Sequence, residues 1–171
     1  WPTFLKSPNH APVSSDNVIP PLKLKWKYKT GGPVYSSPAI VDGKLFIGSH
    51  DSNLYALDAE TGSLLWKFRT NDAITSSPAV VNNIVYFGSK DSYIYAVDAK
   101  KGSLIWKFKT GNKVLTSPVV VDGVVFIGAN DLYLYALSAK DGKLLWKRFL
   151  ADYKYGGVYS SPAVYKGMVY A

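Results

Sequence analysis

The feature that most constrains this chain is a repeat of forty residues. Four of its five tryptophans keep that interval, at Trp26, Trp66, Trp106 and Trp146. A Ser/Thr-Ser-Pro triplet keeps it as well, although its fourth copy comes four residues late; the triplets begin at Ser36, Ser76, Thr116 and Ser160. Self-similarity at such an interval is typical of solenoids, propellers and other arrays. The chain is therefore best interpreted as copies of one structural unit.

Each copy divides into four short segments of β type. In the first copy these are residues 39–41, 44–48, 53–58 and 64–69, and turn residues separate them. Asp42-Gly43 is a strong signal for a two-residue hairpin. The corresponding pairs are Asn82-Asn83, Asp122-Gly123 and Lys166-Gly167. Four antiparallel strands repeated at about forty residues are typical of a propeller blade, whereas the period-two pattern excludes helical repeats. The sequence thus predicts an all-β fold, a β-propeller of four-stranded antiparallel blades.

Counting copies predicts an open arc of three full blades with a partial blade at each end. We expect a lead-in segment at 1–21, the outer strand of a closing blade at 22–30, blades at 31–70, 71–110 and 111–150, and a partial fourth blade at 151–171. An open arc would leave apolar blade faces in water, which soluble monomers rarely tolerate. The remaining blades of a longer polypeptide, self-association into a closed ring, or other chains could cover these faces. The end of the chain in mid-strand favours the longer polypeptide.

Composition excludes several classes of site. The chain has no cysteine, so disulfides, thiolate metal ligands and cysteine nucleophiles are impossible. Its 13 Tyr, 7 Phe and 5 Trp favour strands. The net charge is +8, but the lysines of residues 23–29 alternate with apolar residues, as on a guarded edge strand, and no base-reading motif accompanies them. We therefore expect no nucleic-acid partner, and no apolar run is long enough for a transmembrane segment.

The run from Ala56 to Trp66 reads Ala-Leu-Asp-Ala-Glu-Thr-Gly-Ser-Leu-Leu-Trp. It resembles the tryptophan-docking motif of propellers of the pyrroloquinoline-quinone (PQQ) enzyme type, Ala-x-Asp-x-x-Thr-Gly-x-x-x-Trp. The second copy departs from it at Lys101, and the third at Ser138 and Asp141. The resemblance implies blades arranged radially around a channel, and no single activity. Because glycine leaves room for an indole to lie against backbone, we expect structural docking roles for Trp26, Trp66, Trp106, Trp146, Gly62, Gly102 and Gly142.

The same resemblance raises the question of catalysis. Quinone-dependent dehydrogenases of this family hold their cofactor over the channel, often beside a calcium ion and a catalytic aspartate. Here Asp51, Asp91 and Asp131 follow the forty-residue period, which favours loop formation over metal binding. His10 and His50 have no nucleophile motif beside them. We therefore predict no enzyme activity, cofactor, or catalytic, cofactor-binding or metal-ligating residue for this chain.

The late fourth copy indicates where a partner would bind. Its longer link carries three tyrosines, on the propeller face that hosts ligands in the family. Amphipathic aromatic residues on loops are favoured interface anchors, although the same rings could instead pack the link onto its own blade. The candidate partner-binding residues are Tyr153, Tyr155, Tyr159, Tyr93 and Tyr133.

The leading hypothesis is a non-catalytic scaffold that binds protein or a surface ligand. The resemblance extends to the exported propeller that assists outer-membrane β-barrel assembly, which implies a periplasmic, extracellular or cell-surface location. One alternative is a fragment of a quinone-dependent dehydrogenase whose catalytic residues lie outside this chain. Another is an architectural repeat module of a surface or filament protein.

Overall fold

The computed structural model describes residues 21–150 and 157–171 of the 171-residue chain. Within these ranges the regular elements are all strands. They are β1 Ala39–Val41, β2 Lys44–Gly48, β3 Asn53–Asp58, β4 Leu64–Arg69, β5 Ala79–Val81, β6 Ile84–Gly88, β7 Tyr93–Asp98, β8 Leu104–Lys109, β9 Val119–Val121, β10 Val124–Gly128, β11 Tyr133–Ser138, β12 Leu144–Phe149, β13 Ala163–Tyr165 and β14 Met168–Tyr170. No helix in the described ranges is long and apolar enough to cross a membrane.

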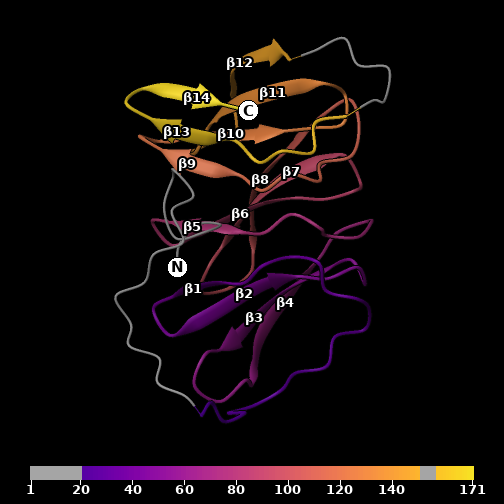
Figure 1. Ribbon diagram of the computed structural model, residues 1–171, viewed down its shortest axis with the longest axis vertical. Helices are drawn as coiled ribbons and strands as arrows, with labels where there is room; N and C mark the ends of the chain where they lie inside the picture. The colour runs from indigo at the N-terminus through magenta and orange to yellow at the C-terminus, as the bar shows by residue number, and fades with distance from the viewer. Residues whose placement is uncertain (1–20, 151–156) are drawn as a thin grey trace.

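The strands form three four-stranded antiparallel sheets in chain order, β1 to β4, β5 to β8 and β9 to β12, and a two-stranded sheet of β13 and β14. Figure 1 shows these sheets following one another along the long axis, from the purple first sheet at one end to the orange third sheet and the yellow pair at the other. The first strands β1, β5, β9 and β13 contact their neighbours in turn, so the sheets radiate from them and β4, β8 and β12 lie outermost. The predicted propeller arc is confirmed.

The two-residue hairpins have the expected backbone. Asp42 and Gly43 both have positive φ, at 49° and 70°. This is the geometry of a type I′ turn, whose twist matches that of the flanking strands. The pairs at 82–83, 122–123 and 166–167 share it. The late fourth copy therefore regains the blade pattern by its first hairpin.

A chain of serine contacts connects successive blades near their inner strands. The amide of Ser37 donates to the hydroxyl of Ser77 at 2.8 Å, and the amide of Ser77 donates to Ser117 at 2.9 Å. The amide of Ser117 then donates to Ser161, also at 2.9 Å, across the longer link. The recurrence of the triplet thus has a structural cause, because each serine hydroxyl satisfies a backbone amide of the preceding blade.

Residues 22–30 form no strand, although the sequence predicts the outer strand of a closing blade there. An outer strand needs a third strand beside it, and none of the described strands pairs with this segment. Side chains fix it instead: the indole of Trp26 donates to the carbonyl of Ala59 at 3.0 Å. The closing-blade role, the lead-in segment and the other blade boundaries remain predictions.

Candidate functional site

Three of the repeated tryptophans dock on the blade that follows them. A Cβ placed on Gly62 would lie 2.5 Å from the Trp26 ring, and the same relation holds at 2.6 Å between Gly102 and Trp66. Gly142 and Trp106 repeat it at 2.6 Å. All three glycines have φ near +70°, so they supply both the turn geometry and the space. The indole nitrogens donate to the carbonyls of Ala59, Ala99 and Ala139.

The fourth tryptophan has no such neighbour among the described residues. Trp146 is 43% exposed and lines a hollow of about 620 Å³ with Leu150, Val169 and Tyr170. By contrast, Trp106 is 8% exposed. The last full blade therefore presents an apolar face of the kind that a neighbouring blade covers elsewhere in the arc.

The repeated aspartates of the loops tie each link to its own blade. Asp51 accepts hydrogen bonds from the Tyr55 hydroxyl at 2.6 Å and from the amides of Gly31 at 2.6 Å and Asn53 at 3.0 Å. Burial alone would raise the pKa of Asp51, but these donors outweigh it and hold the pKa below its ordinary value. Burial and the hydrogen bond to Asp51 raise the pKa of Tyr55 to about 12. The pair thus fastens the link to the blade, and we call Asp51 and its counterparts Asp91 and Asp131 the staple aspartates.

Asp91 and Asp131 repeat this arrangement. Asp91 accepts from the Tyr95 hydroxyl at 2.7 Å and from the Asn71 amide at 3.0 Å, and Asp131 accepts from the hydroxyl of Tyr135 and the amide of Gly111. In the described ranges, no three His, Cys, Asp or Glu side chains lie close enough together to hold a metal ion.

The face formed by the second-to-third loops and the blade links includes several positions at which the copies differ in chemistry. We call it the loop face, and three of its variable positions are Pro33, Ala73 and Lys113; Tyr35, Thr75 and Leu115; and His50, Lys90 and Asn130. One backbone hydrogen bond recurs in each copy. The amides of His50, Lys90 and Asn130 donate to the carbonyls of Pro33, Ala73 and Lys113, respectively. Identical backbone thus presents aromatic, imidazole, ammonium and amide groups side by side.

His50 joins the first two blades at this face. Its ring lies 4.6 Å from the Tyr35 ring, centroid to centroid, and its Nε2 lies 3.2 Å from the Thr75 hydroxyl. Burial and the charge of Lys90 lower its pKa below the ordinary value, against the opposing effect of Asp72, which favours the neutral form of the ring. Tyr35 is 66% exposed and continues this cluster outward. The sequence alone singled out none of these residues as a binding residue, although comparing the copies position by position would have found them.

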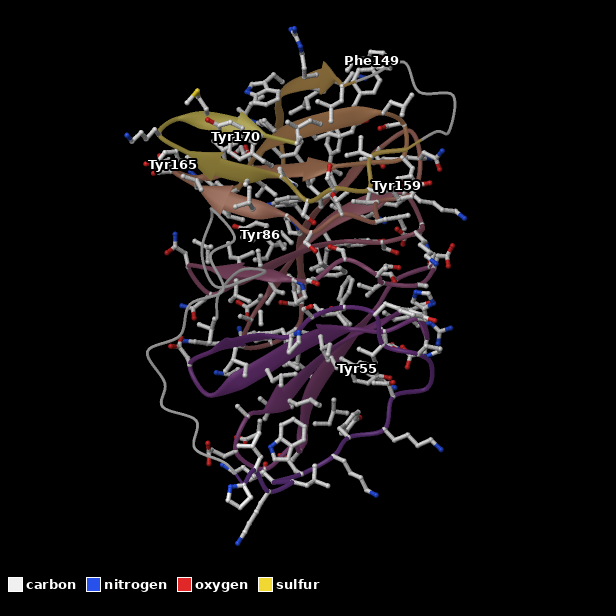
Figure 2. All side chains as sticks on the ribbon, viewed as in Figure 1. Tyr55, Tyr86, Phe149, Tyr159, Tyr165 and Tyr170 are labelled. Carbon is white, nitrogen blue, oxygen red and sulfur yellow. The ribbon has the colours of Figure 1, made fainter. Side chains whose placement is uncertain are left out.

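The predicted tyrosines fall into three groups. Tyr153 and Tyr155 lie outside the described residues. Tyr159 corresponds to Tyr35 in the fourth copy and is 65% exposed; Figure 2 shows it on the opposite side of the molecule from Tyr165, which borders the last hairpin turn. Tyr93 and Tyr133 are half-buried at the starts of β7 and β11.

Lysines of the outer strands lie over these two half-buried rings. The Nζ of Lys107 lies 4.8 Å from the centroid of Tyr93, and that of Lys147 lies 4.5 Å from Tyr133. The Tyr133 ring also packs against Phe149 at 5.4 Å. Tyr93 and Tyr133 therefore contribute to packing in the described structure, and a role for any of the five tyrosines in partner binding remains a prediction.

Blades whose tryptophans dock on glycines of the following blade define the PQQ-like repeat propellers. The sequence profile described as outer membrane protein assembly factor BamB matches residues 22–75 and 50–171. The chain therefore belongs to the PQQ-like repeat family that this profile describes. A search of the curated proteins gave no match.

Solved structures agree on the fold. BamB from Moraxella catarrhalis superposes with a TM-score of 0.75 at 23% identity, over 85% of this chain and 45% of that one. Quinohemoprotein alcohol dehydrogenase from Comamonas testosteroni gives 0.78 at 25%, over 87% and 27%. A europium-containing methanol dehydrogenase gives 0.78 at 20%, over 87% and 31%. The chain thus spans less than half of the length of each, and its structural neighbours include both BamB and dehydrogenases.

Proposed function

We propose that this chain is a non-catalytic, protein-binding part of a BamB-like propeller that works outside the cytoplasm. Membership of the family described as an outer membrane protein assembly factor supports the location and the kind of partner, a component of outer-membrane protein assembly. The remaining blades of the same propeller are further expected neighbours. Self-association into a closed ring would meet the same need for covered blade faces.

The observation that carries the proposal is the distribution of differences among the copies. The strands, docking tryptophans and staple aspartates repeat, whereas the loop face presents different chemistry in each copy. The opposite turns also vary, but there the residues are exposed and charged or polar, such as Glu60, Lys100 and Lys140, as expected for solvated turns. A scaffold whose copies differ at one mixed aromatic and polar face, and otherwise mainly at solvated turns, is suited to recognition of a single partner surface.

A photocrosslinking experiment tests the proposal. A photoreactive amino acid replaces Lys113 on the loop face or, as the matched control, Lys100 in the β7–β8 turn; both side chains are exposed. In the protein expressed in its own cells, we expect a discrete adduct with an outer-membrane assembly component from position 113 and none from position 100. Equal labelling at both positions, or none at either, would contradict the proposal.

A second candidate is part of a quinone-dependent dehydrogenase, which the superpositions on two dehydrogenases favour. Its catalytic residues would then lie outside this chain. Titrating the full-length polypeptide, with every blade present, with PQQ and Ca²⁺ while following absorbance and heat separates the two functions. We expect no saturable uptake, and stoichiometric uptake would favour the dehydrogenase.

A further inference from the structure

The outer wall of the arc concentrates the positive charge of the protein. It is formed by residues 22–30 and by the outermost strands β4, β8 and β12, which together we call the basic rim. These segments contain ten of the 20 Lys and Arg residues and none of the 12 Asp and Glu residues. The basic rim thus carries a formal charge of +10, and the rest of the chain, with ten basic and 12 acidic residues, carries −2.

These cations are exposed and little neutralised. All ten side chains belong to exposed residues, namely Lys23, Lys25, Lys27, Lys29, Lys67, Arg69, Lys107, Lys109, Lys147 and Arg148. Among these ten side chains, and within the described ranges, only Lys25 has an ion-pair partner, Glu60. Guarding a strand edge requires a few charges, but it does not require that every acid be absent. The segregation therefore indicates an anionic binding partner.

Aliphatic side chains stand beside the cations. In β4 the register shifts so that Leu57 pairs with Leu64 and Ala56 pairs with Trp66, which leaves Leu65 as an extra residue. The same shift occurs in β8 and β12, at Ile105 and Leu145. Leu65, Ile105 and Leu145 are 46%, 43% and 53% exposed. Each outer strand therefore offers exposed aliphatic groups from its bulge, followed by two cations.

We infer that the basic rim binds the surface of an anionic phospholipid membrane. Lysine and arginine meet lipid phosphates at such a surface, and short aliphatic side chains reach the boundary of the acyl region. An acidic polypeptide would satisfy the cations, but it would not require an aliphatic group in every blade. The basic rim shares no residue with the loop face, so the inference goes beyond the proposed function.

Vesicle sedimentation of the whole chain tests this inference. The probes are vesicles of phosphatidylglycerol and phosphatidylcholine at 1:1 and vesicles of phosphatidylcholine alone, at low and at high salt. We expect binding to the anionic vesicles at least about tenfold tighter than to the zwitterionic ones, and much weaker binding once salt screens the rim. Absence of binding to the anionic vesicles would overturn the inference.

Matched variants locate the binding surface. K67E/K107E/K147E reverses one equivalent cation in each outer strand, whereas K100E/K140E/K166E makes the same change of charge on exposed turns. We expect the rim variant to lose at least about tenfold in affinity, since each cation near a membrane contributes roughly fivefold, and the turn variant to lose less than about threefold. Equal losses would show a response to net charge alone and overturn the inference.

Two further measurements separate lipid from other acidic partners. L65S/I105S keeps every charge, and we expect it to bind anionic vesicles about threefold less tightly because the aliphatic contact is reduced. Polyglutamate is added as a competitor at equal charge concentration. If polyglutamate displaces the vesicles completely and L65S/I105S binds them like the unchanged protein, the partner is an acidic polypeptide and the inference is wrong. Circular dichroism spectra that match the unchanged protein would show that the variants are folded.

Discussion

Trp106 and Trp146 occupy the same position of the repeat and meet different surroundings. Trp106 lies against Gly142 of the next blade, donates to the Ala139 carbonyl at 3.0 Å and is 8% exposed. Trp146 packs against Phe126 of its own blade, with ring centroids 5.8 Å apart, and is 43% exposed. The tryptophan of the docking motif thus supplies only one side of an interface between two blades. Its indole becomes core only where a following blade supplies the glycine and the carbonyl.

The largest expected effect comes from removing the two indoles in turn. Trp106→Ala should lower the free energy of unfolding by about 3–5 kcal/mol, because it empties a packed site between two blades. Trp146→Ala should lower it by less than about 1 kcal/mol, since that ring already meets water. Urea unfolding followed by circular dichroism measures both. Equal losses would mean that the exposed face of Trp146 is covered in solution.

The glycine side of the interface gives the next effect. Gly142→Ala adds a methyl group 2.6 Å from the Trp106 ring at a φ of 70°, and we expect a cost of more than about 2 kcal/mol. Gly123→Ala is the matched control, because its φ is 75° and nothing lies within 4 Å of the added methyl. Strain alone should then cost about 1 kcal/mol. Similar midpoints for the two variants in urea would show that the contact with Trp106 is not tight.

The serine contacts give a smaller effect. Ser117→Ala removes the acceptor of the buried Ser77 amide, and we expect a loss of about 1–3 kcal/mol in the free energy of unfolding. Ser160→Ala, at an exposed position beside the equivalent serine of the last copy, should change stability by less than about 0.5 kcal/mol. Hydrogen exchange at the Ser77 amide checks the cause, and unchanged protection in Ser117→Ala would exclude it.

The smallest effect concerns Tyr86, whose counterparts in the other copies are Phe46 and Phe126. Its hydroxyl donates to the Ala139 carbonyl, which Trp106 also uses, and burial raises its pKa to about 12. The folded state favours the neutral hydroxyl. The stabilisation that Tyr86 contributes is therefore complete below about pH 10 and is lost as the pH rises through about 12. Stability should fall across that interval, and less steeply in Tyr86→Phe. Identical slopes would contradict the account.

Much of the fold could be predicted because strands and turns depend on local chemistry. The bounds of the four strands in the first copy match the predicted segments, since Asp42-Gly43 and Thr61-Gly62 fix where the chain reverses. Residues 22–30 could not be predicted in the same way, because a strand exists only when a neighbour accepts its hydrogen bonds. The bulge at Leu65 is also a property of the pairing, and not of the residue itself.

The candidate site was less accessible to sequence reasoning. The tyrosines of the late link stand out in one sequence, but two of them lie outside the described residues and Tyr93 and Tyr133 pack under lysines. No motif marks His50 in the sequence. Its contact with Thr75 joins residues of different blades, and only the folded chain brings them together.

The most direct measurement makes the first copy resemble the second at the loop face. Tyr35→Thr with His50→Lys introduces the residues found at the equivalent positions Thr75 and Lys90. In the protein expressed in its own cells, with the photoreactive group at position 113, the account predicts an almost unchanged melting temperature and at least about a fivefold loss of the crosslinked adduct. An undiminished adduct in the folded double variant would contradict the claim that the differences among copies define the binding surface.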